Sequence, residues 1–183
     1  MICWKTPVWR WVGILISLIV IAKDQLIKWL IIVSVYHQQN PNFVGWLTQK
    51  ADRFEQAPRE VTSFFNLVMV WNQGVSFGMM RSDSPNMIYI LSGVAVAISL
   101  GFFVWLWREP LPMHALCTGL ITGGALSNVL DRWRFGAVAD FFDFHIGRFH
   151  WPAFNIADSA ITLGVILMLV HVLFFPHYQE TKK

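Results

Sequence analysis

Four apolar segments, each about as long as a membrane-spanning helix, limit what this chain can fold into. They cover residues 11–35, 87–107, 111–130 and 155–175. A helix needs about 20 mostly apolar residues to cross the hydrocarbon core of a bilayer, where every backbone polar group must be paired. Of the 183 residues, 55% are hydrophobic and only 14% are charged, a composition that fits a bilayer better than water. The segments therefore predict four transmembrane helices.

The first segment is less regular than the others, because Lys23, Asp24 and Gln25 interrupt it. A cleaved signal peptide is the alternative here, since Lys5 and Arg10 precede an apolar stretch of suitable length. No cleavage site of small residues follows the stretch, so we expect a retained span. The third segment is rich in glycine and other small residues, which let another backbone approach closely. We expect it to be a packed, central helix.

The connections between the segments predict which parts share a side of the membrane. Residues 36–86 and 131–154 form long loops, whereas the link at residues 108–110 is short. Because consecutive spans run in opposite directions, the two long loops lie on one side. Residues 64–71 of the first loop are aromatic and β-branched, which favours strands. The predicted fold is one integral membrane domain over residues 1–183, a membrane all-α core of four transmembrane helices with a small external β-containing cradle between spans one and two.

Basic residues bear on orientation and on partners. Lysine and arginine are denser near the two termini than in the long loops, which favours cytoplasmic termini and external loops. The formal net charge is +3, but no basic stripe interleaved with aromatic residues marks a nucleic-acid surface. We therefore attribute the basic excess to contact with anionic lipid headgroups and expect no nucleic-acid partner.

The pattern Asn-x-x-Asp occurs twice, as 128–131 at the end of the third segment and as 155–158 at the start of the fourth. Both positions fall on the side of the long loops, at similar depth. Residues three apart share a helix face, and ionisable groups at a membrane span are costly and mark functional sites. We expect the carboxylates of Asp131 and Asp158 and the amides of Asn128 and Asn155 to converge. For one copy alone, capping of a helix end is the alternative.

Two neighbouring carboxylates predict acid–base chemistry. They do not both ionise readily, so one keeps a proton and acts as an acid while the other polarises a water molecule. Asp158 falls in the first turn of its helix, where free N–H groups favour a charged carboxylate, whereas Asp131 is expected among unpaired carbonyls at a helix end. The sequence therefore predicts aspartic hydrolysis, with Asp158 ionised at rest and Asp131 protonated. Arg132 and Arg134 oppose this assignment by favouring charge on Asp131.

Acidic and histidine side chains in the second long loop also fit a metal site, because divalent ions take such ligands. We favour a surface loop for this group, with Asp140 paired to Arg132 or Arg134, and we expect neither a metal nor another cofactor. The residues concerned are Asp140, Asp143, His145 and His150.

Short blocks along the chain form an ordered set. They are 24–25 (DQ), 72–78 (NQGVSFG), 127–132 (SNVLDR) with 136–141 (GAVADF), and 154–158 (FNIAD). In order and spacing they resemble the signature blocks of the lipoprotein signal peptidase family, signal peptidase II, over nearly the whole chain. The resemblance implies an aspartic endopeptidase of the bacterial inner membrane that removes signal peptides from prolipoproteins, cleaving before a diacylglyceryl-modified cysteine.

The resemblance also implies roles for residues. The family's catalytic aspartates correspond to Asp131 and Asp158. Expected partners are the lipid-modified prolipoprotein and membrane lipids, and the family implies inhibition by the cyclic peptide globomycin. The family usually has Gly at the position of Ser127 and often Thr at that of Ile27, and residues 37–62 exceed its usual link, which affects the shape of the external cradle and not the chemistry. Supporting and substrate-binding positions correspond to Asp24, Asn72, Asn128, Arg132, Asn155 and Ala157.

Other interpretations stay open at this point. Asp24, near Lys23 and Lys28, is either a neutralised helix charge or a group that holds the loop of Asn72 over the two aspartates. A small proton-coupled transporter subunit is an alternative function, since intramembrane aspartates also relay protons, and a non-catalytic membrane adaptor is another. The acids cluster at one face and no repeat of spans is evident, so we favour the peptidase.

Overall fold

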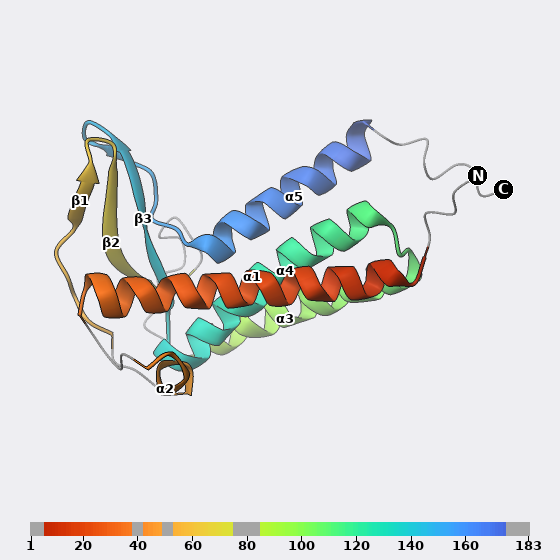
Figure 1. Cartoon of the computed structure of the whole chain (residues 1–183), viewed down its shortest axis with the longest axis horizontal. Helices are drawn as coiled ribbons and strands as arrows, with labels where there is room; N and C mark the ends of the chain where they lie inside the picture. The colour runs from red at the N-terminus through yellow and green to blue at the C-terminus, as the bar shows by residue number, and fades with distance from the viewer. Residues whose placement is uncertain (1–5, 38–41, 49–52, 75–84, 175–183) are drawn as a thin grey trace.

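Long helices run along one axis of the molecule, and a small sheet lies across one end of them (Figure 1). The computed structural model describes residues 6–37, 42–48, 53–74 and 85–174. A π-helix, η1 (Leu30–Val35), continues the first helix, and a short helix, α2 (Phe43–Thr48), follows it. The long helices are α1 (Val8–Trp29), α3 (Pro85–Arg108), α4 (Pro112–Phe135) and α5 (Ile156–Phe174).

The third predicted segment is the one whose boundary differs most from the structure. Helix α4 runs past residue 130 to Phe135, where Gly136 adopts a left-handed conformation with φ of 68° and closes the helix with an N–H bond to the carbonyl of Arg132. Glycine takes this conformation at a helix end without steric cost. Asp131 therefore lies inside α4, before its last turn, and not at the helix end as the sequence predicted.

Membrane-spanning character is clearest for three helices of the described residues. Asn86–Arg108 of α3, together with α4 and α5, are long and apolar enough to cross a membrane. α1 is not in this group, because charged residues interrupt its second half. Two of these, Asp24 and Lys28, are completely buried, so their charges face the bundle and not the surrounding lipid.

α4 is the central helix, as its small residues predicted. A Cβ atom at Gly119 would lie 2.8 Å from the carbonyl oxygen of Gly13 in α1, and one at Gly123 would lie 2.8 Å from that of Ser17. On another side of α4, Gly124 allows close contact with the backbone of Ala157 in α5. Glycine at such positions lets helices pack backbone to backbone, which fixes α1 and α5 against α4.

The sheet is antiparallel and has the order β1-β2-β3-β4. The aromatic run in the first loop forms a strand as predicted, but the third and fourth strands come from the second long loop. The cradle is therefore not confined to the connection between the first two predicted spans. In the pairing of β2 with β3, Asn72 lies opposite Val138 and Val70 lies opposite Asp140. The strands are β1 (Arg59–Thr62), β2 (Phe65–Asn72), β3 (Val138–Ile146) and β4 (Phe149–His150).

An apolar core joins the sheet to the helix ends. Phe141 and Met69 from the sheet pack with Ile32 of η1, Trp46 of α2 and Phe135 of α4. Burial of such large side chains is the main favourable contribution to this packing. It places β3 against the ends of α1 and α4, so side chains on the other face of β3 project towards the start of α5.

Candidate active site

A buried ion cluster lies where α1, α4 and α5 meet. The ammonium Nζ of Lys28 lies 2.6 Å from Oδ2 of Asp24 and 2.6 Å from Oδ2 of Asp131, and all three side chains are 0% exposed. Residues four apart on α1 share a face, which brings Lys28 beside Asp24. A buried charge needs a partner of opposite sign, and here one cation neutralises two carboxylates in part.

Further hydrogen-bond donors contact the two carboxylates of the ion cluster. The Ser127 hydroxyl donates to Oδ2 of Asp24 at 2.7 Å, and the backbone N–H of Ala157 donates to Oδ1 at 2.9 Å. The Gln25 amide donates to Oδ1 of Asp131 at 2.8 Å, and the N–H of Ala139 donates to Oδ2 at 3.2 Å. The cluster thus links α1 and α4 to the first turn of α5 and to β3.

Asn155 and Asp158 cap the start of α5 reciprocally. The backbone N–H of Asp158 donates to Oδ1 of Asn155 at 2.9 Å, and the backbone N–H of Asn155 donates to Oδ2 of Asp158 at 3.3 Å. This is the arrangement of a capping box, which satisfies two N–H groups that the helix leaves free. The capping interpretation is therefore right for this copy of Asn-x-x-Asp. It is wrong for Asn128 and Asp131, which lie inside α4.

A second pair of carboxylates, Asp140 and Asp158, is joined by side-chain amides. Nδ2 of Asn155 donates to Oδ1 of Asp140 at 2.7 Å, while Oδ1 of Asn155 holds the backbone of Asp158. Nδ2 of Asn128 donates to Oδ1 of Asp158 at 2.8 Å. Nδ2 of Asn72 donates to Oδ2 of Asp140 at 3.1 Å. Amides from α4, β2 and the start of α5 thus orient this pair.

Burial and charge act together on Asp140, which is 1% exposed. Desolvation, followed by the nearby negative charge of Asp158, raises the pKa of the Asp140 carboxyl well above its usual range; the bond from Asn72 and the charge of Lys28 oppose this rise. Asp140 therefore keeps its proton where an ordinary carboxyl would have lost it. A protonated carboxyl beside a second carboxyl of different surroundings is the arrangement that acid–base hydrolysis needs.

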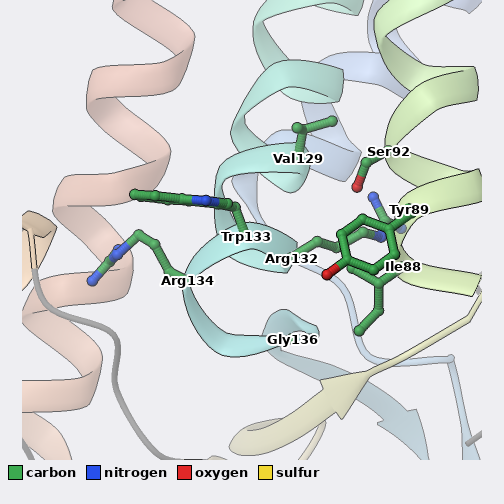
Figure 2. Close-up of a pocket in the computed structure, with 8 residues that line it drawn as sticks. All are labelled: Ile88, Tyr89, Ser92, Val129, Arg132, Trp133, Arg134 and Gly136. Carbon is green, nitrogen blue, oxygen red and sulfur yellow. The ribbon is translucent and has the colours of Figure 1, made fainter. Parts of the chain in front are cut away.

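A cavity of about 550 Å³ opens between α3 and α4 (Figure 2). Arg132 projects into it towards α3, where Tyr89 and Ile88 line the wall, whereas Arg134 projects the opposite way, towards α1. The charge of Arg132 acts more strongly on Asp158 than on Asp131 or Asp140. Its Nε atom is buried without a hydrogen-bond partner among the described residues, so the guanidinium retains donor capacity at the cavity.

The expected convergence of four groups is seen for three of them in their direct hydrogen bonds. Asn128 and Asn155 bond Asp158, whereas Asp131 bonds Lys28, Gln25 and the backbone N–H of Ala139. The reason is geometric, because α4 continues past Asp131 and turns that side chain towards α1. The carboxylate that shares Asn155 with Asp158 belongs to β3.

Two further expectations concern Asp24 and Asp140. The neutralisation of Asp24 by Lys28 is confirmed, and the other carboxylate oxygen of Asp24 accepts from the main chain of Ala157 in α5. The loop of Asn72 beyond Gly74 lies outside the described residues, so its contact with Asp24 stays a prediction. Asp140 bonds amides and not arginines, because Arg134 donates to Oε1 of Gln25 and to the carbonyl of Trp46 and lies over the Trp46 ring.

The four residues weighed as a metal site divide into two groups. Asp140 belongs to the carboxylate pair. Nδ1 of His150 lies 2.9 Å from Asp143, and the ring of His145 stacks on that of His150 with centroids 4.8 Å apart. Across the part of the chain that the structure describes, no three such side chains are grouped to hold a metal ion.

Sequence reasoning gave too little weight to Asp140 and Lys28. A signal for Asp140 exists, because it shares a face of β3 with the apolar residues Val138 and Phe142, and a carboxylate is unusual in such a row. A signal for Lys28 is its spacing of four from Asp24 on α1. Neither signal says which carboxylate each group meets.

Comparison with known proteins identifies related chains. The model of a family described as signal peptidase (SPase) II matches residues 16–174. A lipoprotein signal peptidase of Desulforapulum autotrophicum is 38% identical over 169 residues, which covers 87% of this chain and 90% of the relative. One of Anaplasma marginale is 38% identical over 159 residues, which covers 86% of this chain and 82% of the relative.

A solved structure has the same fold. It is described as a bacterial membrane enzyme determined by the in meso method, and it superimposes with a TM-score of 0.67 at 27% identity, covering 93% of each chain. The three apolar helices and this likeness fit a multi-pass membrane protein. The comparisons give no support to the transporter alternative.

Proposed function

Since the chain belongs to the signal peptidase II family, whose members remove signal peptides from prolipoproteins, we propose that it does so as an aspartic endopeptidase with Asp140 and Asp158 as its catalytic pair. The observation that carries this proposal is the position of Asn155. Its side chain donates to Asp140 and accepts from the backbone of Asp158, so one residue orients both carboxyl groups. In this proposal Asp140 replaces Asp131, the candidate from the sequence.

Asp131 is proposed instead as a structural anion. Its carboxylate is fully buried, lies 2.6 Å from the Lys28 ammonium and accepts from two further donors. A carboxylate so neutralised is a weak base. Its partners on α1 and β3 make it a link between elements.

The two catalytic carboxyls have different proposed roles. Asp158 lies in the first turn of α5, where the helix dipole and the N–H groups favour the charged form. Asp140 has a raised pKa because of burial and the negative charge of Asp158. We therefore assign Asp158 as the general base and Asp140 as the acid.

Peptide hydrolysis then follows in two steps. Asp158 takes a proton from water as the water oxygen bonds to the scissile carbonyl carbon, while the Asp140 proton stabilises the developing oxyanion. The carbon–nitrogen bond then breaks as the proton that Asp158 took from water passes to the leaving amine and the oxyanion re-forms the carbonyl of the new carboxyl group, which leaves Asp158 charged and Asp140 protonated as before. General acid–base groups of this kind contribute roughly 10²–10⁴-fold each to rate.

The remaining residues carried over from the family act on the orientation of this pair. Asn128 and Asn72 each hold one carboxyl group. Asp24 holds the N–H of Ala157 and so the first turn of α5. Arg132 lines the cavity, and its positive charge acts on both Asp158 and Asp140.

The setting of the reaction is part of the proposal. We infer that α1 is a fourth span, because its charges face the bundle, and that the chain forms one integral membrane domain. The termini are cytoplasmic, and the site faces the outer side of the bacterial inner membrane. The substrate is cleaved before a diacylglyceryl-modified cysteine, whose acyl chains stay in contact with lipid, and globomycin is an inhibitor.

Cleavage of a lipidated prolipoprotein by the purified protein in lipid vesicles tests this function. We expect signal-peptide release that globomycin blocks, and a loss of roughly 10³-fold in kcat for Asp140→Asn and for Asp158→Asn. Asp131→Asn is the matched variant, and it should cleave in proportion to its folded fraction, measured by size-exclusion chromatography. Retained cleavage by folded Asp140→Asn, with none by folded Asp131→Asn, would restore the pair expected from the sequence.

A further inference from the structure

An exposed apolar cluster lies at the free end of the sheet, where β3 turns into β4. We name it the sheet tip: Phe64, Phe144, Ile146, Phe149 and Trp151, which with His145 line an apolar hollow of about 430 Å³. Ile146 is 85% exposed and Phe149 is 69% exposed. Contiguous apolar surface of this kind marks a contact with a protein or a membrane. We propose that the sheet tip inserts into the interfacial layer of the bilayer beside α5.

The sheet tip faces the same way as the start of α5. Side chains alternate along a strand, so Phe142, Phe144 and Ile146 share one face of β3. The rings of Phe142 and Phe144 lie 5.7 Å and 5.9 Å from that of Phe154, which precedes α5 by two residues. Phe142 and Phe154 are also bridged through their backbones. This face of the sheet is therefore fixed to the chain that enters the membrane.

The length of α5 sets the depth of the sheet tip. Its 19 residues span about 28 Å at 1.5 Å per residue, close to the roughly 30 Å of a hydrocarbon core. All of α5 is therefore needed to cross, and its first residue lies at the hydrocarbon edge. β3 is hydrogen-bonded to Phe154, just before that first residue, so β3 lies at headgroup level. Figure 1 shows the strands running across the helix axes at this end, so the sheet extends along the membrane plane.

The chemistry of the two faces agrees with this placement. Phenylalanine and tryptophan favour the interface between acyl chains and headgroups, and exposed Arg148 in the turn before β4 suits anionic headgroups. Near the sheet tip the opposite face carries a polar row, because Glu60, Asn66 and Asp143 lie opposite one another in the strand pairing. Insertion of the sheet tip would hold β3, and Asp140 with it, at a constant depth relative to the membrane surface.

Collision accessibility of a spin label tests the insertion. The protein, with Cys3 and Cys117 replaced by alanine, carries one nitroxide at Ile146→Cys in vesicles of phosphatidylethanolamine and phosphatidylglycerol. Leu169→Cys on the outer side of α5 is the lipid reference, and Glu60→Cys on the polar face of the sheet is the water reference. Both reference side chains are exposed in the structure. Phe149→Cys provides a second label in the sheet tip should Ile146→Cys not fold.

We expect the label in the sheet tip to collide with oxygen more often than with a water-soluble nickel chelate, as at residue 169 but at a shallower depth. The label at residue 60 should show the reverse. A label in the sheet tip that behaves like residue 60 overturns the proposal, because the cluster then faces water. Low accessibility to both reagents also overturns it, because a protein, such as a second copy of this chain, would then cover the cluster. Neither result depends on catalysis.

Discussion

Two carboxylate clusters of this molecule, the ion cluster and the proposed catalytic pair, are built in opposite ways. In the ion cluster, Asp24 and Asp131 share the ammonium of Lys28 and are completely buried. In the proposed catalytic pair, Asp140 and Asp158 are held by the amides of asparagines, with no ammonium in hydrogen-bond contact among the described residues. The first arrangement leaves two acids neutralised by a cation and unsuited to proton transfer. The second leaves two acids that are able to exchange protons.

The difference lies in what each partner does to a proton. An ammonium fixes a carboxylate in its charged form, which suits a structural link. An amide orients a carboxyl group but adds no net charge, so burial and the neighbouring acid decide its protonation. The pKa of Asp140 is raised for that reason. Amide ligands therefore allow two adjacent acids to remain unequal.

Removal of the Lys28 charge is the most direct test of whether the ion cluster has a structural role that the catalytic pair does not share. Lys28→Met leaves two carboxylates buried without their cation, and breaking a buried ion pair in this way costs about 3–5 kcal/mol. We expect a large fall in the thermal unfolding temperature in detergent micelles. Lys23→Met on the exposed side of α1 is the matched control.

A double variant sharpens this test. Lys28→Met with Asp131→Asn removes one of the stranded charges, so it should recover part of the lost stability. Equal unfolding temperatures for Lys28→Met and Lys23→Met would show that the ion cluster does not hold the bundle together.

A smaller effect is expected where the two clusters share a neighbour, Ala157. A Cβ atom at Gly124 would overlap the carbonyl oxygen of Ala157 and lie 2.8 Å from Cγ1 of Ile161. Gly124→Ala should therefore push α5 away from α4 and cost about 1–3 kcal/mol, as overpacking does. Asn128 would also move from Asp158, so kcat should fall with stability.

Gly93→Ala in α3 is the control for this substitution, because a Cβ atom there meets nothing within 4 Å. We expect it to leave cleavage and the unfolding temperature nearly unchanged. Equal behaviour of the two alanine variants would mean that the contact of α4 with α5 does not position Asp158.

The smallest expected effect concerns pH. If Asp140 acts as the acid, cleavage is lost as pH rises through its raised pKa, because the proton it donates is then absent. The bond from Asn72 lowers that pKa, so Asn72→Ala should move the alkaline limb of the kcat profile to higher pH. One lost hydrogen bond to a charged or acidic group should also reduce kcat/KM by about tenfold. An alkaline limb that moves to lower pH would contradict the assignment of Asp140 as the acid.

Prediction from the sequence succeeded where local pattern was enough. The apolar segments coincide closely with α1 and η1, α3, α4 and α5, and the aromatic run coincides with β2. Small residues predicted the central position of α4, and the first-turn position of Asp158 is confirmed. These features depend on composition, periodicity and spacing within one segment.

Prediction failed where two segments had to be placed against each other. Spacing alone made Asp131 and Asp158 look equivalent, because both follow an asparagine by three residues. The continuation of α4 to Phe135 turned Asp131 towards Lys28, and the pairing of β3 with β2 brought Asp140 to Asn72. Neither contact can be predicted from the residue pattern of one segment.

The sequence by itself determined that this protein is a membrane-spanning helical chain with a strand-forming loop, and its ordered blocks indicated the peptidase family. Those properties follow from hydropathy and from short motifs, which are local. Only the tertiary structure decided which acids share an amide and which share a cation. A hydrogen bond or an ion pair acts over about 3 Å, so its partners depend on how distant segments pack and not on their order in the chain.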